Sequence, residues 1–131
     1  MIFLDTTYIV SFLVDTEENH KRALKLSKQL QGQKLVITNA ILTETMNLLT
    51  KKLNRNTKSI VKAYELIKNN FKIIYETKEL TEKSMKTLVK YKAKIGLTDA
   101  LTIEIMKELK IHEIFTFDDH FDNKEGILRV H

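Results

Sequence analysis

The chain begins with Met1-Ile2-Phe3-Leu4-Asp5-Thr6-Thr7, in which apolar residues lead directly into a carboxylate and two hydroxyl groups. A short apolar run without alternation is typical of a strand that is buried on both faces of a parallel sheet. Asp5 would then lie at the carboxyl end of this strand, which is the edge where open α/β sheets bind ligands. The stretch therefore predicts a fold class and the position of a functional site.

The rest of the chain alternates between short apolar runs and helical patterns. Further strands are expected at 35–37, 71–75, 113–117 and 127–130, and helices at 8–14, 20–31, 40–53, 59–69, 77–94 and 99–110. Strands that alternate with helices are typical of an α/β fold with a central, mainly parallel sheet of four to five strands between two helical layers.

Several details of the helices follow from the spacing of their residues. In the helix at 59–69 we expect Ile60, Val61, Tyr64 and Ile67 to point inward. Gly96 should end the preceding helix, and Thr98 is expected to cap the helix that starts at residue 99.

Composition limits the function classes. The 131 residues suit one domain with its own core, so a single domain over 1–131 is expected. No apolar stretch approaches the roughly 18 residues of a membrane span, no signal peptide is visible, and cysteine is absent, which together favour a cytoplasmic protein without disulfides or thiolate metal sites. A net charge of +5 favours a polyanionic partner such as nucleic acid.

Four carboxylates lie at element boundaries: Asp5, Glu44, Asp99 and Asp118. Strand ends and the starts of the following helices share one edge of a parallel sheet, so these side chains should converge. Like charges at one place repel each other, and a divalent cation would neutralise them. Oxygen ligands without cysteine select Mg²⁺ or Mn²⁺, and these ions activate water and bind phosphate oxygens, so phosphodiester hydrolysis is implied.

Each carboxylate also has a simpler explanation. Glu44 and Asp99 lie in first helical turns, where the helix dipole favours a negative charge, and Asp118 could be a turn former. Asp5 is harder to explain in this way, because a carboxylate at the end of a buried strand needs a cation or hydrogen-bond donors.

The ordered set of motifs resembles the PIN-domain ribonucleases. The matching segments are Ile2–Thr7, Thr38–Glu44, Leu97–Ala100 and Phe115–Phe121, and their order and spacing fit that family over essentially the whole chain. The length is most similar to that of the toxin of VapBC-type toxin–antitoxin pairs. The resemblance implies a PIN-like sandwich, Mg²⁺- or Mn²⁺-dependent endoribonuclease activity on RNA, a small antitoxin partner and a homodimer.

The resemblance also implies roles for single residues. Asp5, Glu44, Asp99 and Asp118 would be the catalytic and metal-binding carboxylates, with Asp5 and Asp99 as direct ligands. Two hydroxyl residues, Thr7 and Thr116, would support and orient them. Asp119 and Asp122 compete with Asp118 for the fourth position, and Asp118 is preferred because it keeps the Thr-x-Asp-x-x-Phe spacing.

Other features are less specific. Lys51, Lys52 and Arg55 follow Glu44 along its helix and are candidates for contacts with RNA phosphates, although most charge runs are solvated faces. His120 lies near the expected site and is assigned to a turn. Residues 8–30 are rich in apolar side chains, which either form core or bind a partner chain.

Two alternatives to a toxin remain open. The first is a housekeeping RNA-processing PIN nuclease without an antitoxin, and the second is a non-catalytic RNA-binding module. A P-loop or dinucleotide-binding enzyme is disfavoured, because no glycine-rich loop follows any expected strand.

Overall fold

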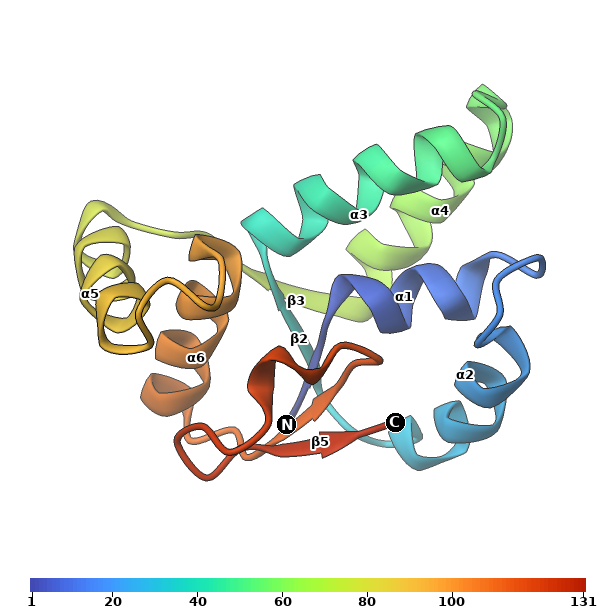
Figure 1. The fold of residues 1–131 in the computed structure, drawn as a ribbon. Helices are drawn as coiled ribbons and strands as arrows, with labels where there is room; N and C mark the ends of the chain where they lie inside the picture. The colour runs from blue at the N-terminus through green and yellow to red at the C-terminus, as the bar shows by residue number, and fades with distance from the viewer.

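A computed structural model describes residues 1–131 and contains a five-stranded parallel sheet in the order β3-β2-β1-β4-β5 (Figure 1). The strands are β1 (Ile2–Leu4), β2 (Leu35–Thr38), β3 (Phe71–Ile74), β4 (Glu113–Phe115) and β5 (Leu128–Val130). The helices are α1 (Thr6–Leu13), α2 (His20–Leu26), α3 (Asn39–Lys52), α4 (Thr57–Asn70), α5 (Lys78–Lys90) and α6 (Leu97–Leu109), with 3₁₀ helices η1 (Ser27–Leu30) and η2 (Asp119–Phe121). The predicted α/β class is confirmed, and the sheet has five strands.

The strand order explains how the helices are divided between the two faces of the sheet. The chain moves from β1 to β2 and β3 in one direction and returns to β4 on the other side of β1. Right-handed crossovers then require α5 and α6 to lie opposite the earlier helices, and Figure 1 shows α5 and α6 on the side away from α1 and α2. The strand order therefore reverses between β1 and β4, and ligand crevices of open α/β sheets form at such a reversal.

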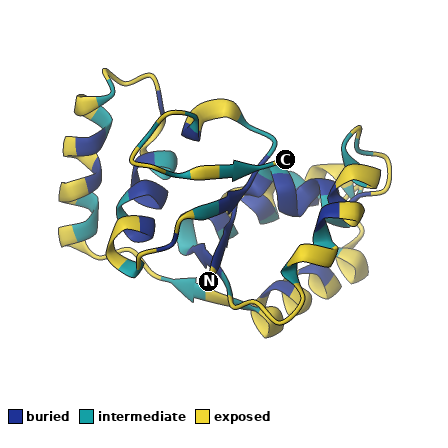
Figure 2. Cartoon of the chain, turned by 90° about the horizontal axis from the view of Figure 1, so that it is seen from below, coloured by how far each residue is buried: buried dark blue, intermediate teal, exposed yellow.

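The core is centred on β1, which lies between β2 and β4 in the sheet. Phe3 is aligned with Val36 of β2 and Ile114 of β4, and all three side chains are fully buried. Buried residues follow the central strands and the inner faces of the helices (Figure 2). Burial of each large apolar side chain stabilises the fold by roughly 1.5–3 kcal/mol, so the central strand is a firm support for the residues that follow it.

The inward face of α4 differs from the one expected. Val61 and Tyr64 are 58% and 38% exposed, so their predicted inward orientation is wrong. The buried residues of this helix are Ala63 and Ile67. Large apolar side chains dominate the spacing pattern of this segment, whereas the small Ala63 faces the core.

The segment between α5 and α6 also differs from the prediction. Helix α5 ends at Lys90 rather than near Lys94, and Lys92 and Ala93 have positive φ angles in the turn that follows. Helix α6 starts at Leu97 with Gly96 at its N-cap position, so Thr98 lies inside the helix and the prediction that it caps is wrong. No helix combines the length and the hydropathy that crossing a membrane would require.

The burial pattern of α4 gives a stability prediction. Replacement of Ile67 by Ala should lower the free energy of unfolding by about 2–5 kcal/mol, because it leaves a cavity in the core. The matched change Val61→Ala should alter it by less than about 1 kcal/mol, because Val61 is exposed. Urea denaturation of both variants measures the difference, and equal losses would contradict the orientation of α4.

Candidate active site

Asp5 lies between the end of β1 and the start of α1. Its side chain is only 5% exposed, and its backbone N–H donates to the carbonyl of Phe115 on β4 at 3.0 Å. The Thr116 hydroxyl donates to Asp5 Oδ2 at 2.7 Å, and the Thr7 hydroxyl reaches the same oxygen at 3.3 Å. Two residues that flank the strand reversal therefore hold this buried carboxylate in place.

The same two hydroxyls join β4 to α1. Thr7 Oγ1 and Thr116 Oγ1 are 3.0 Å apart. Because the Thr116 proton points to Asp5, the single proton of Thr7 is shared between Thr116 Oγ1 and Asp5 Oδ2. Each oxygen also accepts a backbone N–H, from Phe117 for Thr7 and from Asp118 for Thr116, both at 3.0 Å. Thr7 and Thr116, the expected supporting residues, thus both contact Asp5, and their role in the site stays a prediction.

Glu44 reaches the site from α3. The Thr6 hydroxyl donates to Glu44 Oε2 at 3.3 Å and accepts from the Thr45 hydroxyl at 3.2 Å. Glu44 itself is exposed, whereas Thr6 and Thr45 are both buried. The hydrogen bond from the buried Thr6 therefore fixes the orientation of the Glu44 side chain. Neither threonine was predicted from the sequence as a site residue, although Thr6 directly follows Asp5 and Thr45 directly follows Glu44.

Asp99 and Asp118 meet through a histidine. Asp99 lies in the first turn of α6, and its Oδ2 accepts from the backbone N–H of Gly96 at 3.4 Å and lies 2.8 Å from His120 Nδ1. Asp118 Oδ2 is 3.2 Å from the same ring nitrogen, and Asp118 Oδ1 accepts the backbone N–H of His120 at 3.1 Å. His120 does lie in a tight turn, η2, as expected. Its side chain also contacts two of the four carboxylates, a contact that was not predicted from the sequence.

The charges of the site act on one another. The pKa of Asp5 is raised from 3.8 to about 6. Burial is the largest cause and the negative charges of Asp99 and Glu44 add to it, while the hydrogen bond from Thr116 acts in the opposite direction. The pKa of His120 is also raised. Burial alone would lower it, but the hydrogen bond to Asp99 and the charges of Asp99 and Asp118 outweigh burial. Asp99 and Glu44 therefore lie close enough to Asp5 for electrostatic repulsion.

The two competitors for the fourth carboxylate differ in their surroundings. Asp122 forms a two-point ion pair with Arg129, at 2.8 and 3.0 Å, and this arginine lowers the pKa of its carboxyl. Asp119 is exposed, and its carboxylate lies within 4.8 Å of ligand atoms of Asp118 and His120. Asp118 is linked to Asp5 through Thr116 and to Asp99 through His120, so it has the strongest geometric connection to the other carboxylates.

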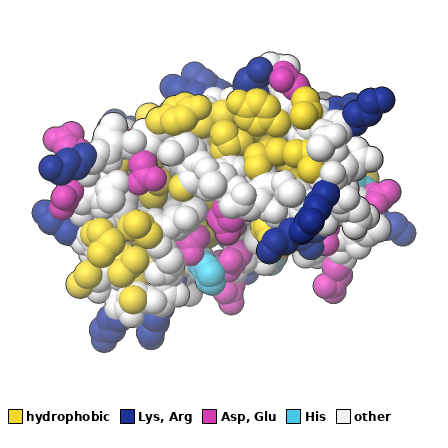
Figure 3. Space-filling view, turned by 90° about the horizontal axis from the view of Figure 1, so that it is seen from above, with side chains coloured by type: hydrophobic (Ala, Val, Ile, Leu, Met, Phe, Trp, Pro, Cys, Tyr) yellow, Lys and Arg dark blue, Asp and Glu magenta, His cyan; other side chains and the backbone are white.

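The expected basic residues do not share one environment. Lys52 forms an ion pair with Glu17 at 3.0 Å, and both line a polar pocket of about 360 Å³ that also includes Thr7 and Phe117. Lys51 and Arg55 are exposed, and neither lines this pocket. Figure 3 shows acidic side chains and a histidine gathered near the middle of one face of the molecule.

The donor set fits a hard divalent cation. The site offers carboxylate and hydroxyl oxygens and no sulfur, and the charges of Asp99 and Glu44 contribute to the raised pKa of Asp5. Asp5, Glu44 and Asp99 have hydroxyl or backbone N–H donors that fix one carboxylate oxygen each. Oxygen donors of this kind are the ligands that such an ion prefers.

Comparison with protein families decides the classification. The model of the PIN domain matches residues 2–127. The chain belongs to the PIN-domain family. Its membership and its fold support a nuclease, and PIN nucleases generally use a divalent metal. The candidate cluster whose ligand atoms lie within 4.8 Å of one another consists of Asp118, Asp119 and His120.

Solved structures share this fold. VapC20 from Mycobacterium tuberculosis, a sarcin–ricin loop-cleaving toxin, superposes with a TM-score of 0.81 and 21% identity over 92% of each chain. VapBC2 from Rickettsia felis, bound to a promoter DNA fragment, gives 0.71 and 16% identity over 99% of this chain and 98% of that one. A toxin–antitoxin complex from Klebsiella pneumoniae gives 0.67 and 20% identity over 98% and 96%. A comparison with curated protein sequences gave no significant match.

The raised pKa of Asp5 predicts a pH-dependent stability. Ionised Asp5 destabilises the metal-free folded PIN domain, so its stability should fall as the pH rises from about 4 to about 6 and then stay level. Asp5→Asn removes this effect. The variant should match the wild type near pH 4 and exceed it by up to about 3 kcal/mol at pH 7.

Urea denaturation in EDTA across this pH range measures the difference. Asp15→Asn is the control, because Asp15 is exposed and lies outside the site. A stability gain for Asp5→Asn that is the same at pH 4 and pH 7 would contradict the burial of a charged carboxylate.

Proposed function

We propose that this single PIN domain, residues 1–131, is a Mg²⁺- or Mn²⁺-dependent endoribonuclease and the toxin component of a toxin–antitoxin pair in the cytoplasm. The observation that carries the proposal is the position of Asp5, which is buried at the strand reversal and close enough to Asp99 and Glu44 for their charges to raise its pKa. A folded chain keeps such repulsive groups together at a loss of stability, which is typical of a functional site.

The four carboxylates Asp5, Glu44, Asp99 and Asp118 are proposed as both the catalytic residues and the metal ligands. A bound ion would polarise a phosphate oxygen and lower the pKa of a water molecule. The chain's own contribution is orientation: Thr116 fixes one oxygen of Asp5, and Thr6 fixes one oxygen of Glu44. Both supports are attached to packed strands or helices, so the carboxylate oxygens are held ready for the ion.

RNA is the proposed substrate because it is a polyanion and the protein has a net charge of +5. Lys52 is the best placed of the three basic candidates, since it lines the polar pocket that shares Thr7 with the site. Lys51 and Arg55 would contact more distant phosphates of the same strand. These contacts position the RNA, while the carboxylates act on the bond that is cleaved.

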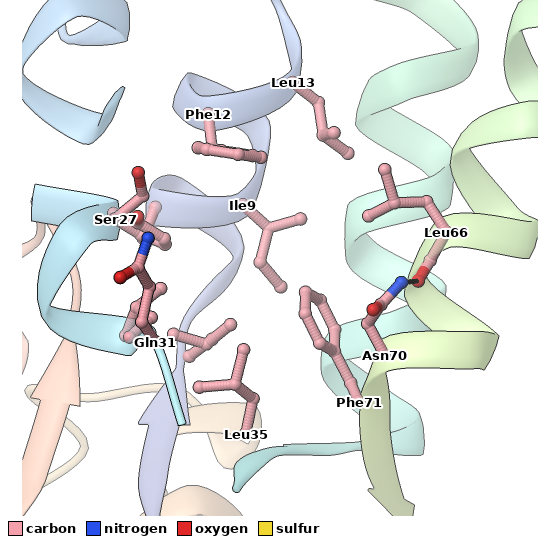
Figure 4. A pocket seen from close by; sticks show the side chains of 12 residues that line it. Ile9, Phe12, Leu13, Ser27, Gln31, Leu35, Leu66, Asn70 and Phe71 are labelled. Carbon is pink, nitrogen blue, oxygen red and sulfur yellow. Dashed lines mark hydrogen bonds between the residues drawn. The ribbon is translucent and has the colours of Figure 1, made fainter. Parts of the chain in front are cut away.

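A second surface supports a protein partner. A pocket of about 380 Å³ lies between α1, η1, β2 and the junction of α4 with β3, and nine of its twelve lining residues are hydrophobic. In Figure 4, Ile9 and Leu13 of α1 point toward Leu66 and Phe71 across this pocket. The apolar side chains of residues 8–30 thus contribute to an open groove as well as to the core. We propose that the antitoxin binds there through an apolar segment.

A homodimer is also proposed, as the resemblance implies. Met85 and Val89 lie one turn apart on α5 and are 44% and 67% exposed, so they offer a small apolar face for a second copy.

The housekeeping nuclease remains the second candidate. A housekeeping nuclease would use the same proposed chemistry but would have no antitoxin. A short reading frame for a DNA-binding antitoxin next to the gene would therefore distinguish the toxin from the housekeeping nuclease. The non-catalytic RNA-binding module is disfavoured, because simple RNA binding does not require a cluster of carboxylates that repel a polyanion.

RNA cleavage by carboxylate variants tests the proposed function. With Mn²⁺, the wild type should cleave a single-stranded RNA, and Asp99→Asn should lower the rate by at least about 100-fold, because it removes a proposed metal ligand. Asp118→Asn should also lower it, whereas Asp119→Asn should keep it within about threefold. EDTA should abolish cleavage and added Mn²⁺ should restore it.

Circular dichroism of each variant confirms that the fold is intact. A folded, partner-free wild type that cleaves no RNA with either metal would count against the function. Equal losses for Asp118→Asn and Asp119→Asn would count against the assignment of the fourth carboxylate.

A further inference from the structure

His120 is the one basic side chain that makes direct contact with the proposed carboxylates. Its Nδ1 lies 2.8 Å from Asp99 Oδ2 and 3.2 Å from Asp118 Oδ2. An ionised carboxylate has no proton to donate, so the N–H belongs to the imidazole and is shared between the two acids. The ring therefore links two carboxylates that come from different parts of the chain.

This contact uses oxygens that a cation would need. Asp99 Oδ2 already accepts from Gly96 N–H, and the imidazole adds a second, shorter bond to the same atom. Asp118 Oδ1 accepts the backbone N–H of His120, so Oδ2, which faces the ring, is the oxygen left for other partners. A cation that bridged Asp99 Oδ2 and Asp118 Oδ2 would need the space between these two oxygens, which the imidazole N–H occupies.

The imidazole ring can leave the two carboxylates while the backbone of His120 stays in place. The side chain of His120 is 44% exposed, whereas the next residue, Phe121, is fully buried and anchors η2 in the core. The backbone N–H of His120 stays bound to Asp118 Oδ1, so rotation about the side-chain bonds alone would move the imidazole to solvent. Neither η2 nor Asp118 needs to shift for the exchange.

We propose that His120 and the divalent cation are alternative occupants of the Asp99–Asp118 pair, so that the imidazole links the two carboxylates in the metal-free protein and is displaced when the ion binds. The inference rests on the proposed function only in the assignment of Asp99 and Asp118 as metal ligands. A contact that stabilises the metal-free state and is lost on binding must weaken metal affinity. His120 is thus a positioning residue that sets how much Mg²⁺ or Mn²⁺ the site requires.

The test is a titration of the full chain with MnCl₂ by calorimetry. His120→Ala should bind Mn²⁺ about three- to tenfold more tightly than the wild type, the range that corresponds to one partly exposed hydrogen bond. The metal-free variant should also melt at a lower temperature than the wild type, and saturating Mn²⁺ should remove this difference. His112→Ala is the matched control, because His112 is exposed and lies before β4, at the opposite end of the strand from Thr116.

A second readout follows the ring itself. In ¹⁵N-labelled protein, addition of diamagnetic Mg²⁺ should move the His120 imidazole resonances toward those of a solvent-exposed histidine. Weaker Mn²⁺ binding by His120→Ala would overturn the proposal, because the imidazole would then be a ligand. Unchanged binding would also overturn it. Because neither readout involves RNA, a protein that shows the exchange but cleaves no RNA would separate this inference from the proposed function.

Discussion

The hydrogen bond from Thr116 to Asp5 is the contact on which the site depends. It joins the end of β4 to the end of β1, the two neighbouring strands between which the strand order reverses. At 2.7 Å it gives a buried carboxylate a donor that offsets part of its desolvation. Thr7 extends the contact to the first turn of α1 and to the backbone of Phe117, so two hydroxyl groups connect β1, β4 and α1 at this edge of the sheet.

The site is a compromise between stability and function. Burial and two neighbouring negative charges raise the pKa of Asp5, so its ionised form weakens the metal-free fold. The surrounding core of β1, with Phe3 and Leu4 fully buried, supplies the stability that tolerates this group. A bound divalent cation would turn the repulsion among these carboxylates into attraction to the ion. In the metal-free protein, the contacts of His120 with Asp99 and Asp118 reduce the repulsion between these two residues.

The sequence predicted the features that depend on local pattern. The run before Asp5 has no alternation because its strand is covered on both faces, and that signal is visible without coordinates. The inward face of α4 was misjudged because the small Ala63, and not Val61, faces the core. His120, Thr6 and Thr45 were missed as site residues because their contacts span 21 to 39 positions, and nothing local marks a threonine or histidine whose partner is distant.

The position of the cation is the central claim, and anomalous diffraction from crystals grown with MnCl₂ tests it most directly. The account predicts a manganese peak bound by carboxylate oxygens of Asp5 and Asp99, with the His120 ring turned away from Asp99. A manganese peak elsewhere on the molecule, with Thr116, Asp5 and Asp99 unchanged and no ion between them, would contradict it.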